Sequence, residues 1–329
     1  MATSRLTTCL EAGTFVLPDA GRILLMNPQA DTDLAALPRD RCHAVQGFRP
    51  DFDALRARGF DCAPAPEGRY AASIVFLPRA RDRAFADVAL ANAITDGVVM
   101  IDGQKTDGIE PMLKHLRARL TLDGQVSKAH GKAFWFPASD ILSDWASAGP
   151  APNADGWITA PGVFSADAVD PASALLAETL PAKLGAAVAD FGAGWGYLAA
   201  RVLEREGIDT LHLVEADHAA LDCARSNITD PRARFHWADV PTWVFPERLD
   251  TVVMNPPFHT SRKADPDLGR AFIAAAAGAL KPGGHLWLVA NRHLPYEATL
   301  NDLFAQVSEA AGSSKFKVLH AQRPSRARR

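Results

Sequence analysis

The 329-residue sequence has few cysteines and no long apolar run. Its four cysteines are scattered, without a Cys-x-x-Cys pair or a Cys/His ligand spacing, which argues against a disulfide framework and against zinc. No stretch of about 18 uninterrupted apolar residues occurs, and the first residues lack a basic segment followed by an apolar one. Neither a membrane-spanning helix nor a secretory leader is therefore indicated. We expect a cytoplasmic protein that holds no metal.

An excess of basic residues is also missing. The chain has 35 Lys and Arg against 38 Asp and Glu, for a formal net charge of −3. A nucleic-acid partner would therefore have to be bound by local basic patches. Apolar residues, in contrast, are plentiful: 48% of the chain is hydrophobic, which is enough in 329 residues for two domains with cores of their own.

A stretch of small residues, prolines and glycines at 146–156 divides the chain into two halves. Such a composition is typical of a connection between two cores. We place the boundary near Pro152, which predicts domains at residues 1–152 and 153–329. In each half, short apolar runs alternate with helical patterns, which is typical of α/β domains. Two such domains of similar size suggest an ancient duplication.

Each half is expected to form a doubly wound sheet, because continuous apolar runs are typical of parallel strands buried on both faces. In the first half, the expected strands are 23–26, 73–77, 98–101 and 134–136, and the expected helices are 51–58, 82–93 and 109–120. In the second half, the expected strands are 187–191, 211–214, 235–237, 251–254 and 286–290, and the expected helices are 198–206, 219–227 and 268–280.

The last part of the chain follows a different pattern. Residues 315–321 alternate between apolar and polar side chains, which predicts an antiparallel edge strand. Residues 299–311 fit either a helix alone or a helix that runs into a strand.

Three glycines follow the strand expected at 187–191. Asp190 stands near the end of this strand, and Gly192, Gly194 and Gly196 lie in the turn that opens the next helix. Glycine is needed where the backbone approaches a ligand closely or takes a positive φ. A glycine loop of this kind serves dinucleotides as well as S-adenosylmethionine, so alone it is a weak signal.

Acidic residues follow the next two strands. Glu215 ends the second strand, where a carboxylate can accept hydrogen bonds from both ribose hydroxyls of an adenosine. Asp239 follows the third strand, where a carboxylate can accept one from the adenine amino group. Together with Asn255-Pro256-Pro257-Phe258 after the fourth strand, Asp239 makes the sequence resemble class I methyltransferases, and this resemblance implies that Asp190 lies near the methionyl ammonium of S-adenosylmethionine.

The strongest signal is Asn255-Pro256-Pro257-Phe258, directly after the strand expected at 251–254. The two prolines restrict the backbone, so that the Asn side chain and the neighbouring carbonyl become rigid acceptors at the ligand-binding edge of the sheet. If Asn255 Oδ1 and the Pro256 carbonyl each accept one N–H of an exocyclic amine, its lone pair faces the methyl donor. Phe258 can stack on the base. This chemistry needs no strong base, and His259 is not required.

Segments spread over residues 157–321 carry a wider pattern: Pro161-Gly162-Val163-Phe164-Ser165, Asp170 with Ser173, the glycine loop, residues 255–259 and 290–296, and Phe316-Lys317-Val318. Together they resemble the bacterial small-subunit ribosomal RNA methyltransferase C family. The resemblance implies two tandem Rossmann-like class I methyltransferase domains, the first one degenerate. It also implies that the second domain methylates N2 of a guanine in 16S ribosomal RNA, and that Phe164 helps form the cofactor pocket.

The first half agrees with this layout, although it resembles the family only in short pieces. No glycine follows the expected strand 23–26 directly: the chain continues with Asn27-Pro28. After the strand at 73–77 comes Pro78-Arg79-Ala80-Arg81 where an Asn-Pro-Pro motif would stand. We therefore expect the first half to lack both cofactor and amine sites. Its arginines, and the four in residues 323–329, either bind RNA phosphates or form solvated surface.

The sequence as a whole predicts an S-adenosylmethionine-dependent methyltransferase that acts on ribosomal RNA or the small ribosomal subunit. The same chemistry fits a guanine of 23S ribosomal RNA, an adenine N6 amine or a protein glutamine, because all present a planar NH2 group. A different interpretation is a non-catalytic RNA-binding assembly factor that retains a methyltransferase shell.

Overall fold

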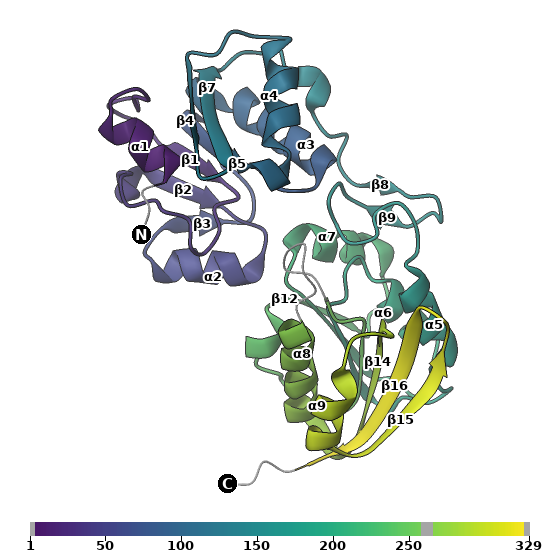
Figure 1. The fold of residues 1–329 in the computed structure, drawn as a ribbon. Helices are drawn as coiled ribbons and strands as arrows, with labels where there is room; N and C mark the ends of the chain where they lie inside the picture. The colour runs from purple at the N-terminus through teal and green to yellow at the C-terminus, as the bar shows by residue number, and fades with distance from the viewer. Residues whose placement is uncertain (1–3, 258–265, 326–329) are drawn as a thin grey trace. The chain divides into compact units, whose positions relative to one another are not determined.

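The computed structural model describes residues 4–257 and 266–325, and it divides into two compact units, Met1–Gly149 and Pro150–Arg329 (Figure 1). The sequence placed this boundary three residues later. Each unit contains a seven-stranded sheet with helices on both faces. The predicted tandem α/β fold is confirmed. Within the described parts of the chain, no helix is long and apolar enough to cross a membrane.

The sheet of the first unit has the order β3-β2-β1-β4-β5-β7-β6, in which β1 to β5 run parallel and β6 and β7 are antiparallel. The strands are β1 (Ile23–Met26), β2 (Cys42–Val45), β3 (Asp61–Ala63), β4 (Tyr70–Phe76), β5 (Thr95–Gln104), β6 (Gly124–Lys128) and β7 (Gly131–Pro137). The helices are α1 (Arg5–Glu11), α2 (Arg49–Ala57), α3 (Arg81–Ala93) and α4 (Ile109–Arg117), with short 3-10 turns η1 (Arg39–Arg41), η2 (Lys105–Asp107) and η3 (Ser143–Trp145).

The second unit repeats this topology, with the order β12-β11-β10-β13-β14-β16-β15. Its strands are β10 (Ala187–Phe191), β11 (Thr210–Glu215), β12 (Ala233–Trp237), β13 (Leu249–Met254), β14 (Leu280–Asn291), β15 (Phe304–Gly312) and β16 (Phe316–Pro324). Its helices are α5 (Pro171–Thr179), α6 (Tyr197–Leu203), α7 (His218–Asn227), α8 (Pro266–Ala279) and α9 (Tyr296–Leu303), with a 3-10 turn η4 (Val240–Thr242). The short strands β8 (Ala151–Pro152) and β9 (Ile158–Thr159) pair with each other.

Strand β10 shows how the sequence builds this doubly wound arrangement. All five of its residues are buried. Ala189 and Phe191 join the core under α8 and α9, whereas Val188 joins the core under α5, α6 and α7. Because side chains alternate along a strand, an uninterrupted apolar run supplies both faces, and burial of each large apolar side chain stabilises the fold by about 1.5–3 kcal/mol.

The structure corrects one predicted strand position and adds elements that the sequence analysis missed. Residues 315–321 do form an antiparallel strand, β16, but it lies between β14 and β15. The edge strand is β15, into which helix α9 runs, so the second interpretation of residues 299–311 is confirmed. β16 is interior because Val318 and Leu319 are buried on opposite faces, while β15 is mostly exposed. The elements missed are α1, α5, β2, β3 and β6, together with the short β8 and β9.

Candidate active site

The glycine loop lies between the carboxyl end of β10 and the start of α6. Gly192, Gly194 and Gly196 have φ angles of 74°, 55° and 97°, a region that side chains rarely adopt. At Gly196 a Cβ atom would also lie 2.8 Å from Ile228 Cδ1 and 3.3 Å from Ala224 Cβ, so the positive φ and the close approach of α6 to α7 together favour glycine. The loop therefore turns tightly and leaves its backbone open to a ligand.

Asp190 is a buried carboxylate without a partner. Its side chain is completely buried, and among the described residues neither carboxylate oxygen has a hydrogen-bond partner. Burial, and then the nearby negative charge of Glu215, raise the pKa of Asp190 to about 8. A polar group in this state destabilises the protein unless a ligand satisfies it. A cationic group such as an amino-acid ammonium fits this position.

Glu215 lies next to the glycine loop. Its Oε2 accepts a hydrogen bond from the Gly194 backbone N–H at 2.8 Å, and its Oε1 accepts one from Asp217 N–H at 2.8 Å. Burial raises the pKa of Glu215. Ala238 N–H donates a hydrogen bond to the Glu215 carbonyl at 3.0 Å. Asp239, the next residue, therefore follows directly on a contact with the end of β11. The predicted carboxylates thus follow neighbouring strands at one edge of the sheet.

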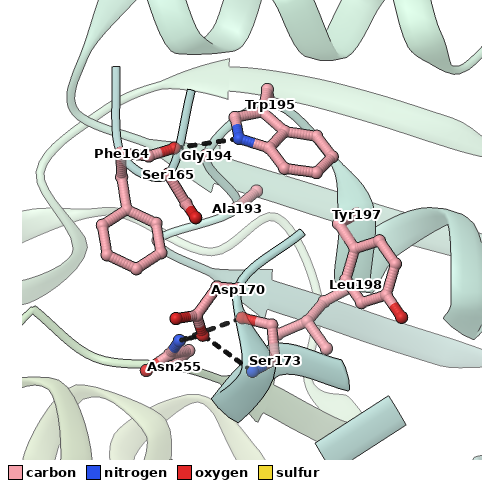
Figure 2. Close-up of a pocket in the computed structure, with 11 residues that line it drawn as sticks. Phe164, Ser165, Asp170, Ser173, Ala193, Gly194, Trp195, Tyr197, Leu198 and Asn255 are labelled. Atoms are coloured by element: carbon pink, nitrogen blue, oxygen red, sulfur yellow. Dashed lines mark hydrogen bonds between the residues drawn. The ribbon is translucent and has the colours of Figure 1, made fainter. Parts of the chain in front are cut away.

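Phe164 projects over this edge from the segment before α5. Its carbonyl accepts a hydrogen bond from Trp195 Nε1 at 2.9 Å, which ties the segment to the glycine loop. Its ring is held out from the core, with 57% of the residue exposed. The ring lies beside a small cavity of about 40 Å³ (Figure 2). The residues that line this cavity are Phe164, Ser165, Asp170, Ser173, Gly192, Ala193, Gly194, Trp195, Tyr197, Leu198 and Asn255.

Asn255 reaches the same cavity from the carboxyl end of β13. Its amide nitrogen donates to Asp170 Oδ2 at 3.0 Å and to Ser173 Oγ at 2.9 Å (Figure 2). Asp170 caps the first turn of α5, where its Oδ2 also accepts from Ser173 N–H at 2.8 Å. Both amide hydrogens of Asn255 are therefore donated inward, and its carbonyl oxygen is left as an acceptor.

Four of the predicted site residues line the cavity: Phe164, Gly192, Gly194 and Asn255. Among the described residues, Asp190, Gly196, Glu215, Asp239, Pro256 and Pro257 are not part of its lining. Phe258 and His259 lie outside the described residues. Sequence reasoning missed five lining residues, and it gave Asp170 and Ser173 no separate role; the five are Ser165, Ala193, Trp195, Tyr197 and Leu198. Asp170-Pro171 before a small-residue helix was an available N-cap signal.

Comparisons with known proteins agree with this geometry. Residues 156–320 match the family model described as Methyltransferase small domain. The chain is 30% identical to ribosomal RNA small subunit methyltransferase C of Hahella chejuensis, covering 92% of this chain and 95% of that protein. It is also 30% identical to the protein of that name from Pseudomonas aeruginosa, with 92% and 94% covered.

A solved structure is similar over both units. It is the 16S rRNA N2 guanine methyltransferase of T. thermophilus in complex with AdoMet and guanosine, with a TM-score of 0.77 and 27% identity. The similarity covers 96% of this chain and 92% of that one. Fold and site thus define an S-adenosylmethionine-dependent class I methyltransferase. The chain belongs to the ribosomal RNA small subunit methyltransferase C family.

Proposed function

We propose that this enzyme transfers a methyl group from S-adenosylmethionine to the N2 amine of a guanine in 16S ribosomal RNA. The observation that carries the proposal is the amide of Asn255, which lines a cavity beside the glycine loop and whose carbonyl oxygen accepts no hydrogen bond from the described residues. The T. thermophilus relative, bound to AdoMet and guanosine, supports the same substrate class. The cytoplasm, where ribosomal RNA is made, is the proposed place of action.

The residues present fit the cofactor. Asp190 would take the methionyl ammonium, which satisfies its unpartnered buried carboxylate. Glu215 would accept hydrogen bonds from the ribose and Asp239 from the adenine amine, with Phe164 covering the cofactor. Gly192 and Gly194 leave room for its close approach, and Gly196 lets α6 pack against α7 behind the loop. When bound, the cofactor supplies an electrophilic methyl group on a sulfonium.

The chain itself orients the amine. The N2 nitrogen of guanine is a weak nucleophile because its lone pair is delocalised into the ring. Asn255 Oδ1 and the Pro256 carbonyl would each accept one N–H, which directs the lone pair toward the methyl group. As positive charge develops on the nitrogen, these two dipoles stabilise it, and the excess proton leaves afterwards to water. Pro257 keeps the segment rigid, and Phe258 would stack on the base.

A paired guanine hides its amine, so the target base must leave its stack to reach this edge of the sheet. Ribosomal RNA, naked or in the small subunit, has to be held while this happens. We assign this holding role to the first unit, Met1–Gly149. Its Arg79 lies just before α3 and Arg81 begins that helix, where the Arg81 guanidinium lies over the Phe85 ring at 5.6 Å.

The test is transfer of labelled methyl from S-adenosylmethionine to ribosomal subunits, followed by mapping of the modified nucleotide. We expect label on one guanine N2 of 16S ribosomal RNA. Label on 23S ribosomal RNA, on an adenine or on a protein glutamine would overturn the substrate assignment but not the amine chemistry. If calorimetry detects no binding of S-adenosylmethionine to the full chain, the catalytic proposal fails and an assembly factor remains.

A further inference from the structure

Two residues distant in sequence hold the Asn255 side chain. Asp170 and Ser173 lie 85 and 82 positions before Asn255, at the first turn of α5. Each accepts one of the two hydrogens of the Asn255 amide nitrogen. Among the described residues, none donates a hydrogen bond to Asn255 Oδ1. The carbonyl oxygen is therefore the end of the side chain that is available to a substrate.

The direction of this amide follows from the chemistry of its neighbour. An ionised carboxylate offers acceptors only, so the NH2 end of Asn255 must face Asp170. If the amide turned by 180°, its oxygen would lie against a carboxylate oxygen, and both amide hydrogens would lose their partners. A mismatch in this partly buried contact disfavours the turned state by about fivefold or more.

We propose that Asp170, assisted by Ser173, is a positioning residue that makes Asn255 present only a hydrogen-bond acceptor to the methyl acceptor. A site arranged in this way favours a methyl acceptor whose nitrogen carries hydrogens that Asn255 can accept. It disfavours an acceptor oxygen that carries no hydrogen. The inference rests on the proposed function, because it assumes that Asn255 receives the amine. It assigns to Asp170 a role that its helix cap does not require.

The two roles of Asp170 can be separated by side-chain length. The cap needs one oxygen near Ser173 N–H, and serine provides this as well as aspartate. The bond to Asn255 needs the longer side chain. Both bonds of Asp170 go to one oxygen, Oδ2, so an asparagine can form both with its single carbonyl oxygen. Asp170→Ser therefore keeps the cap alone, and Asp170→Asn is the matched control that keeps both.

The kinetic test compares these variants in the full chain, with small ribosomal subunits as substrate. For Asp170→Ser we expect kcat to fall on the order of 10²-fold, as for a misplaced reactive group. KM for the subunit and the affinity for S-adenosylmethionine should stay within about threefold. Asp170→Asn should restore most of the kcat. Equal loss in both variants would show that the negative charge matters, which overturns positioning by hydrogen bonds.

A second measurement does not depend on activity. The chain has seven asparagines, so selective ¹⁵N-asparagine labelling gives few side-chain signals, and loss of one pair in Asn255→Asp assigns Asn255. We expect slow hydrogen exchange at this amide in the wild type and in Asp170→Asn, and faster exchange in Asp170→Ser. Unchanged exchange in Asp170→Ser overturns the inference. If the wild type transfers no methyl to subunits, the proposed function fails, while the exchange data still decide the positioning.

Ser173 provides a weaker version of the same effect. Ser173→Ala removes one of two acceptors and leaves the carboxylate in place, so we expect a smaller fall in kcat, about threefold to tenfold. The fall should be accompanied by a smaller gain in exchange at the Asn255 amide. An effect on kcat larger than that of Asp170→Ser would contradict the leading role given to Asp170.

Discussion

The two units share a strand order but differ at the edge of the sheet where ligands bind. In the first unit, Asn27 N–H donates to the Val45 carbonyl at 2.9 Å; in the second, Gly192 N–H donates to the Val214 carbonyl at 2.8 Å. Asn27 therefore stands where the second unit has the first glycine of its loop. It keeps a positive φ of 56°, but its side-chain Nδ2 donates a hydrogen bond to Asp87 Oδ2 of α3 at 2.8 Å.

The strand register extends this correspondence to the acidic residues. Met26 pairs with Val45 as Phe191 pairs with Val214, so Leu25 corresponds to Asp190 and Gln46 to Glu215. Leu25 is buried in an apolar cluster. Gln46 satisfies itself locally: its Nε2 donates to the Pro28 carbonyl and its Oε1 accepts from Phe48 N–H, both at 2.8 Å.

The fourth strand shows the same replacement. Val75 pairs with Met26 as Met254 pairs with Phe191, so Phe76 stands where Asn255 stands. Where the second unit has Asn255 at its cavity and the buried carboxyl group of Asp190, the first has apolar or internally bonded groups. One fold thus serves two purposes. A sheet edge whose polar groups are bonded within the protein favours stability, whereas an edge whose polar groups still lack partners can bind a ligand.

The largest expected effect is at the amine site. Asn255→Ala should lower methyl transfer by about 10²–10³-fold, because it removes a dipole aimed at developing charge. Binding of S-adenosylmethionine, measured by calorimetry, should stay within about threefold. Asn301→Ala, at an exposed asparagine of α9, is the matched control and should be neutral. Wild-type turnover by Asn255→Ala would refute the orientation mechanism.

Replacement of the third loop glycine tests whether the second unit needs its open loop. Gly196→Ala adds a Cβ at φ 97° and 2.8 Å from Ile228 Cδ1, and should lower the free energy of unfolding by about 2–4 kcal/mol. It should also weaken the binding of S-adenosylmethionine. Gly207→Ala is the control, with φ 73° and open space around the Cβ, so it shows the backbone strain alone. If denaturant titrations give equal losses of unfolding free energy for Gly196→Ala and Gly207→Ala, the contact with Ile228 contributes nothing.

Asp190→Asn removes the ionisable group of the second unit at the position where the first unit has the uncharged Leu25. The pKa of Asp190 is about 8 in the fold against about 4 in an unfolded chain, so the folded, cofactor-free protein holds an extra proton between these values. Its stability should therefore fall as pH rises from 4 through 8. The variant should lose this dependence and melt higher than wild type at pH 9, while binding S-adenosylmethionine about tenfold or more weakly. Parallel melting curves for the two proteins from pH 6 to 9 would contradict the assignment.

The smallest effect is expected in the first unit. Gln46→Glu restores an acid at the position of Glu215, but its carboxylate would face the Pro28 carbonyl. We expect a loss of about 1–3 kcal/mol in unfolding free energy at pH 7 and no second cofactor site, with calorimetry still giving one S-adenosylmethionine per chain. Gln46→Met, which has similar length without charge, separates the lost hydrogen bonds from the added charge. Binding of two S-adenosylmethionine molecules per chain would contradict the inference that the first unit has no cofactor site.

The sequence by itself determined the fold class and the positions of most strands, because buried parallel strands such as β10 and β13 are continuous apolar runs. It also identified the glycine loop and Asn255, because glycine and proline act on their own backbone. Tertiary structure decided the rest. β2 contains His43, whose ring bonds Tyr70 Oη at 2.6 Å, and β15 contains few apolar residues, so neither has a clear local signal. The hold of Asp170 on Asn255 joins residues 85 positions apart, and only the packing of α5 at the end of β13 brings them together.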